Sequence, residues 1–194
     1  MLKIVKYPHP ALRHESRPIR RVDKELRRIV GEMFELMYEN GGIGLAANQV
    51  GLPYRLVVMN LEPDARDPKN ELVLINPVIA RKSGHEEKEE GCLSLPGIYA
   101  PVARSANVTA SAYDLSGLET KYRASGLLAR AFQHECDHLD GVLFIDRTTA
   151  RGEPELETKI LELERAFTDA RGGGEIPDDE AIAEEIARLE ALRT

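Results

Sequence analysis

The stretch SGLLARAFQHECDHLDG, residues 125–141, decides how this chain folds, because it joins a helical pattern to a group of metal-binding side chains. Four of its residues recur at steps of four, three and four and therefore share one helix face: Leu127, Ala131, His134 and His138. Gly141 can supply the left-handed stop that ends a helix. The sequence thus predicts a helix from about Ser125 to Asp140 with two histidines on its apolar face.

The two histidines are the sharpest chemical signal in the chain. They lie one helical turn apart in the string His134-Glu135-Cys136-Asp137-His138, so both imidazoles can reach one metal ion. The glutamate that follows the first histidine can hold a water against the metal without binding the metal itself. The alternative is two packed histidines with an incidental glutamate. A chance match to this pattern is rare, so the pattern favours a metal site.

A catalytic site of this kind normally has three protein ligands. No histidine follows His138, and Phe144 occupies the position where an extended zinc-protease pattern has its third histidine. Cys136 lies roughly 200° around the helix from His134, so we interpret it as a packing residue. Cys92 lies between a glycine and a leucine in the glycine-rich, polar-flanked stretch EGCLSLPG (90–97), which is unlike a strand core. We therefore predict that Cys92 is the third ligand, as a thiolate.

Further periodic segments surround this helix. Asp23–Asn40 shows a second helical period, and GGIGLAANQVG (41–51) is a glycine-rich loop with a polar tip. HEEKEE (85–90) is predicted as a solvated hairpin region, and the segment after residue 151 contains two helical patterns. Five segments are predicted strands: RLVVMN (55–60), ELVLINP (71–77), IYAPVAR (98–104), NVTASAYD (107–114) and ETKYRA (119–124). Residues 61–70 form a polar turn between the first two. We predict an α+β fold in which short antiparallel or mixed β-sheets pack around the central HExxH helix, with C-terminal helices.

Composition excludes several classes of protein. The 194 residues are 42% hydrophobic, yet no run approaches the roughly 20 apolar residues of a membrane span. The first residues lack the apolar stretch of a secretory signal. Two cysteines exclude a disulfide framework and favour a reducing compartment. We expect a cytoplasmic protein of bacterial type that does not bind membranes.

Charge is unevenly distributed along the chain. Residues 152–194 carry 13 acidic and 5 basic side chains, whereas residues 1–151 have a net charge of +1. Nucleic-acid binders normally show a basic face. We interpret the basic cluster of residues 17–28 as a solvated helix face together with the segment that leads into this helix. No direct nucleic-acid binding is predicted. We divide the chain into a catalytic domain, residues 1–150, and an acidic helical extension, residues 151–194. The last twenty residues of the extension follow a glycine triplet, so we expect them to be either mobile or docked elsewhere.

Three motifs then carry a resemblance: GIGLAANQ (42–49), EGCLS (90–94) and HECDH (134–138). In order and spacing they resemble the motifs of the peptide deformylase family, over about residues 1–150. The resemblance implies one divalent metal ion on Cys92, His134 and His138. It further implies Fe2+ as the expected ion, with Zn2+, Ni2+ or Co2+ able to substitute.

The same resemblance implies a reaction. The substrate is the N-terminal formyl-methionine of a nascent polypeptide, and the products are formate and a free amino terminus. Glu135 is the implied general base and then acid. The Gln49 amide and the backbone N–H of Leu93 are the implied donors to the oxyanion.

Substrate contacts are expected around the glycine-rich loop. Gly42 and Gly44 let the backbone run beside an extended substrate, like an added strand. Ile43, Leu93 and the stem of Arg130 are candidate walls for the methionine side chain, with core packing as the alternative for each.

Two other functions stay open at this point. A HExxH metallopeptidase needs a third ligand downstream, which the sequence does not offer. A metal-stabilised module that binds nascent-chain ends needs neither Glu135 nor Gln49 in its position. Asp137 either orients a neighbouring basic group or a ligand histidine, or forms a surface salt bridge.

The extension bears on a ribosome contact. Some deformylases contact the ribosome through a basic C-terminal helix, and the net charge of −8 over residues 152–194 argues against such a contact here. We expect residues 172–194 to be dispensable for turnover.

Overall fold

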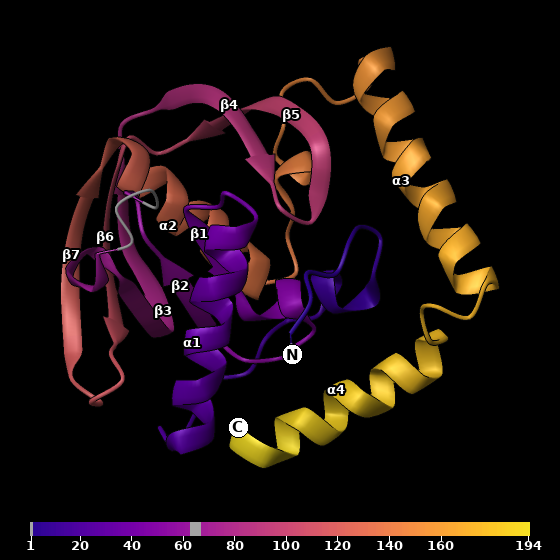
Figure 1. Cartoon of the computed structure of the whole chain (residues 1–194). Coiled ribbons are helices and arrows are strands. Elements are labelled where there is room, and N and C mark those ends of the chain that lie inside the picture. The colour runs from indigo at the N-terminus through magenta and orange to yellow at the C-terminus, as the bar shows by residue number, and fades with distance from the viewer. Residues whose placement is uncertain (1, 63–66) are drawn as a thin grey trace.

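The computed structural model describes residues 2–62 and 67–194, which form two β-sheets with helices around them (Figure 1). Every pairing in both sheets is antiparallel. The larger sheet has the order β1 (Gly44–Ala46), β2 (Leu56–Met59), β3 (Leu72–Ser83), β6 (Asn107–Tyr113), β7 (Glu119–Ser125). The smaller sheet pairs β4 (Glu86–Cys92) with β5 (Leu95–Arg104). The predicted α+β class is confirmed.

The helices begin and end close to the predicted positions. They are α1 (Lys24–Glu39), α2 (Gly126–Leu139), α3 (Pro154–Gly172) and α4 (Asp179–Arg193). At the start of α1 the Asp23 carboxylate accepts a hydrogen bond from the Leu26 N–H at 2.8 Å. At its end Gly41 has φ 66°, a left-handed conformation that glycine adopts without a steric cost. Local sequence signals therefore set these helix bounds.

Helix α2 is central to the fold. Ala129, Phe132 and Leu139 are fully buried and pack in one cluster with the inner residues of the larger sheet. In Figure 1 the helix lies between that sheet and the β4–β5 hairpin. Both histidines of the HExxH string are thus held between two layers, as the sequence predicts.

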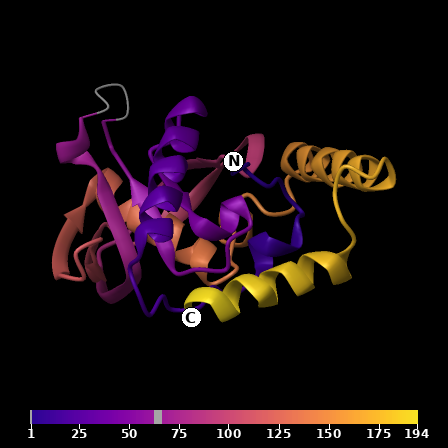
Figure 2. The same cartoon turned by 60° about the horizontal axis from the view of Figure 1, so that its bottom comes forward.

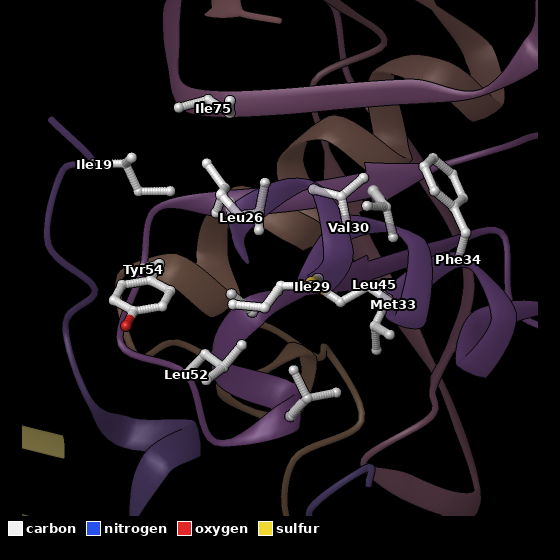
Figure 3. Packing of buried hydrophobic residues seen from close by; sticks show 14 of the residues in the cluster. Ile19, Leu26, Ile29, Val30, Met33, Phe34, Leu45, Leu52, Tyr54 and Ile75 are labelled. Carbon is white, nitrogen blue, oxygen red and sulfur yellow. The ribbon is translucent and has the colours of Figure 1, made fainter. Parts of the chain in front are cut away.

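Helix α1 positions the glycine-rich loop. Its apolar stripe, which includes Leu26, Val30 and Met33, packs against Leu45 of β1 and against Tyr54 (Figure 3). The loop itself is more regular than predicted. Gly44–Ala46 pairs with β2, and Ala47–Val50 forms a 3-10 helix, because backbone groups buried beside α1 need partners.

The acidic segment predicted as a solvated hairpin region forms most of β4. Its charged side chains Glu87, Lys88 and Glu89 are exposed, whereas Glu90 is buried. Pairing with β5 satisfies the backbone hydrogen bonds of β4, so this segment forms a strand although its exposed side chains are charged. Residues 63–66 of the polar turn predicted at 61–70 lie outside the described residues.

The C-terminal segment is docked on the body. Ile182 and Ile186 of α4 pack on Ala11 of the 3-10 helix Pro10–Arg13. Arg193 forms an ion pair with Asp23 at 2.6 Å, which ties the end of α4 to the start of α1. Figure 2 shows α4 running along the body, so the docked alternative is confirmed. Whether turnover needs these residues stays a prediction. In the described part of the chain no helix is long and apolar enough to cross a membrane.

Replacing Ile182 by Ala should lower the free energy of unfolding by about 2 kcal/mol, because it removes buried methyl groups and leaves a cavity. Leu192 lies on the same helix but is 52% exposed, so Leu192→Ala is the matched control and should change stability by less than about 0.5 kcal/mol. Urea unfolding of both variants measures the difference. Equal effects would contradict the docking of α4.

Candidate metal centre and active site

Two segments bring three potential metal ligands together. Cys92 ends strand β4, and His134 and His138 project from α2. One ligand atom from each side chain lies within 4.8 Å of the other two. The Cys92 Sγ lies 3.3 Å from the Nε2 of His138. Each of the predicted ligands is therefore present in one cluster.

The donor set fits a divalent transition metal. One sulfur and two imidazole nitrogens suit Zn2+, Fe2+ and similar ions. The Nδ1 of His134 is taken by the Glu90 carboxylate at 3.0 Å, which leaves the Nε2 free for a metal. The Nδ1 of His138 is buried and has no hydrogen-bond partner among the described residues. Cys136 is buried outside the cluster, and burial raises the pKa of its thiol to about 12.

The histidines differ in their affinity for protons. Burial opposes a proton on His134, but hydrogen bonds to Cys92 and Glu90 outweigh it and raise the pKa of His134 to about 10. Burial and the neighbouring His134 charge lower the pKa of His138 well below its usual value. A metal ion competes with the proton on these groups, since it needs neutral imidazoles.

Glu135 lies beside the cluster without being part of it. Its side chain is buried, and its Oε2 has no hydrogen-bond partner within the described residues. Burial raises the pKa of Glu135 to about 7, although the His134 charge opposes this. A Cβ on Gly44 would collide with the other carboxylate oxygen, Oε1. Glycine at position 44 therefore makes room for this carboxylate.

Gln49 presents its amide nitrogen to the cluster. The Oε1 accepts a hydrogen bond from the Ala46 N–H at 2.8 Å, which sets the orientation of the amide. The Nε2 then donates toward the Cys92 Sγ at 3.3 Å and the Ser94 Oγ at 3.4 Å. This neutral donor can face a developing negative charge.

A cavity of about 500 Å³ opens onto these groups. Its lining includes nine of the ten predicted site residues: Gly42, Ile43, Gly44, Gln49, Cys92, Leu93, Arg130, His134 and Glu135. Only His138 lies behind the lining, at 1% exposure. The structure thus brings together, around one open cavity, the residues that the sequence analysis selected.

Arg130 has a contact that the sequence did not indicate. Its Nη1 forms an ion pair with Glu90 at 2.6 Å and also donates to the Val102 carbonyl at 3.0 Å. Its Nη2 donates to the Glu86 carbonyl at 2.9 Å. The guanidinium is therefore held by β4 and β5, and other parts of the residue line the cavity.

Sequence reasoning missed the role of Glu90 and Arg104. The Glu90 carboxylate accepts hydrogen bonds from Arg104 at 2.7 and 2.8 Å, and Arg104 also binds Asp137 at 2.6 Å. Asp137 in turn pairs with Arg147, so it orients basic groups in a buried network. The available signal was that Glu90 lies two positions before the predicted ligand Cys92. Its partner Arg104 lies 14 positions further along the chain, so the sequence did not indicate the contact.

Comparisons with known proteins show which family the chain belongs to. The sequence profile of the polypeptide deformylase family matches residues 1–153. The chain belongs to the peptide deformylase family. A peptide deformylase of Rhodopirellula baltica is 44% identical over 193 residues, covering 100% of this chain and 96% of that protein. One from Neisseria gonorrhoeae is 44% identical and covers 82% of this chain and 94% of its own. A crystal structure of the Plasmodium falciparum peptide deformylase superposes with a TM-score of 0.83 at 42% identity, covering 86% of this chain and 98% of that one.

The family gives the reaction. The enzyme removes the N-terminal formyl group from nascent polypeptides. It is a peptide deformylase and not a metallopeptidase or a binding module. The family match and the Cys/His/His cluster together indicate a metal ion.

Replacing Gly44 by Ala should lower kcat/KM by about 10²-fold, because the added Cβ displaces the Glu135 carboxylate. Formate release from a formyl-methionyl peptide measures the effect. Gly31 in α1 has no atom within 4 Å of the position of an added Cβ, so Gly31→Ala is the control and should keep full activity. A fully active Gly44→Ala enzyme would contradict the tight fit at Glu135.

Proposed function

We propose that Cys92, His134 and His138 hold the metal ion and that the native ion is Fe2+. The supporting observation is one cavity lined by Cys92 and His134 of the Cys/His/His cluster, by Glu135 and by Gln49, with His138 directly behind the lining. A thiolate ligand suits softer and redox-active ions, and imidazole suits iron as well as Zn2+, Ni2+ and Co2+. When bound, such an ion acidifies water and polarises the formyl carbonyl.

Glu135 moves the proton in this proposal. Its Oε2 is buried, unpartnered among the described residues and close to the ligand cluster, so it can accept a proton from the attacking water. The same oxygen then returns the proton to the nitrogen of the departing amine. A raised pKa suits a group that must both accept and donate a proton near neutral pH.

Gln49 and Leu93 stabilise the negative charge on the former formyl oxygen. The Gln49 Nε2 already points to the cluster, because its Oε1 is held by the Ala46 N–H. The backbone N–H of Leu93 follows Cys92 directly and supplies a second donor. Such donors act on a charge that develops only during the reaction, and loss of one typically costs about 10²–10³ in rate.

The rest of the cavity binds the substrate. Gly42 and Gly44 let the peptide backbone run beside strand β1 in the manner of an added strand. Ile43, Leu93 and Arg130 surround the methionine side chain. Selectivity for the formyl group, the smallest acyl group, should come from a space beside the metal ligands that is too tight for larger acyl groups.

The cellular setting completes the proposal. We infer that the enzyme acts in the cytoplasm of a bacterial-type cell, which its two free cysteines and its bacterial relatives support. Any contact with the ribosome should avoid the acidic helices α3 and α4, because ribosomal RNA repels them.

The Glu135→Gln variant tests the proton-transfer role. It should lower kcat by about 10³-fold, because an amide cannot take the proton, while the metal content stays unchanged. Glu87 is an exposed glutamate of β4 that does not line the cavity, so Glu87→Gln is the matched control and should keep the wild-type rate. A Glu135→Gln enzyme with full activity would refute the proposal.

Metal analysis tests the ion. Protein purified without oxygen should contain about one iron per chain, and the Cys92→Ala variant should lose most of it. Exposure to air should inactivate the iron-containing enzyme, whereas the enzyme reloaded with Ni2+ should keep its activity in air. Zinc as the only ion in anaerobically purified, active protein would show that the native metal is not iron.

A further inference from the structure

The segment of residues 5–7 joins the two loops that form the active site. The backbone N–H of Val5 donates to the carbonyl of Gln49 at 2.9 Å. Two residues later the Tyr7 N–H donates to the carbonyl of Ser94 at 2.9 Å. The N-terminal segment thus connects the loop that contains Gln49 to the turn that follows Cys92.

Lys6, between these two contacts, reaches the same turn with its side chain. Its Nζ donates to the Leu93 carbonyl at 2.7 Å. The peptide group that contains this carbonyl also contains the N–H of Ser94, which donates to the Cys92 Sγ at 3.4 Å. The ammonium, the peptide group and the sulfur therefore form one hydrogen-bond chain.

The physical effect of this chain has a definite direction. A cation on a carbonyl oxygen polarises the peptide and makes its N–H a stronger donor, since linked hydrogen bonds strengthen one another. The charges on Lys6 and Cys92 also interact directly: burial lowers the pKa of Lys6, and the Cys92 charge opposes that shift. Within the described part of the chain Lys6 has no carboxylate partner, so its charge acts on the turn.

We propose that Lys6 is a positioning residue that tunes the Cys92 thiolate through the Leu93–Ser94 peptide group. By strengthening the Ser94 N–H···Sγ bond it withdraws electron density from the sulfur, so the thiolate donates less to the metal and the metal is a stronger Lewis acid. It also fixes the turn that carries the Leu93 N–H. This inference rests on the proposed ligand role of Cys92.

Three variants separate this role from a structural one. Lys6→Met removes the charge and keeps the length of the side chain, and Lys6→Arg restores a cationic donor. Lys3→Met is the matched control, because Lys3 is an exposed lysine in the same N-terminal segment. We expect Lys6→Met to lower kcat about tenfold with little change in KM, at the low end of what loss of an outer contact to a metal site costs. Lys6→Arg should recover most of the rate, and Lys3→Met should match the wild type.

The absorption spectrum of the Co2+-loaded proteins gives a readout that does not depend on turnover. A sulfur that is less strongly hydrogen-bonded donates more readily, so the sulfur-to-cobalt charge-transfer band of Lys6→Met should shift to longer wavelength. The band should return toward the wild-type position in Lys6→Arg and stay in place in Lys3→Met.

The outcomes separate this proposal from the ligand assignment. An unshifted band in Lys6→Met overturns the role of Lys6 and leaves Cys92 as a ligand. A raised KM with unchanged kcat also overturns it, because Lys6 would then contact the substrate. A wild-type protein without any sulfur-to-cobalt band overturns both.

Discussion

The buried carboxylate of Glu90 is the contact on which the active site depends. It accepts hydrogen bonds from Arg104 of β5, from Arg130 of α2 and from His134, so one charge joins the hairpin to the central helix. Burial alone would raise the pKa of Glu90, but its partners, led by Arg104 and His134, hold it far below the usual value. Loss of one member of such a network leaves an uncompensated charge in the interior, which typically costs about 3–5 kcal/mol. The network therefore holds strand β4, which ends at Cys92, against helix α2, which carries the two histidines.

The catalytic geometry follows from this attachment. Strand β4 ends at Cys92 and bends into the turn at Leu93, while α2 presents His134 and Glu135 to the same cavity and holds His138 behind its lining. The third wall is the loop after α1, where small residues allow the backbone to approach the carboxylate. Three separate parts of the chain thus meet at one point, and none of them forms a site alone.

Helix α4 contributes no residue to the cavity lining. It buries Ile182 and Ile186 on the body and pairs Arg193 with Asp23, the cap of α1. Most of the charged side chains on α4 are acidic, and negative charge repels a polyanionic surface. These contacts stabilise the fold, and they explain how a segment after a glycine-rich linker is nonetheless docked.

The sequence by itself determined everything that depends on short-range spacing. The four-residue step between His134 and His138, the helical period of Asp23–Asn40 and the strand signal at 107–114 are local patterns, and α2, α1 and β6 formed where these patterns predicted them. Three short motifs were enough to assign the family. Only the tertiary structure decided how Glu90 holds His134, how Lys6 reaches Leu93 and how the Gln49 amide reaches Cys92. These contacts join residues 44, 87 and 43 positions apart, and they depend on strand register and layer packing, which local periodicity does not encode.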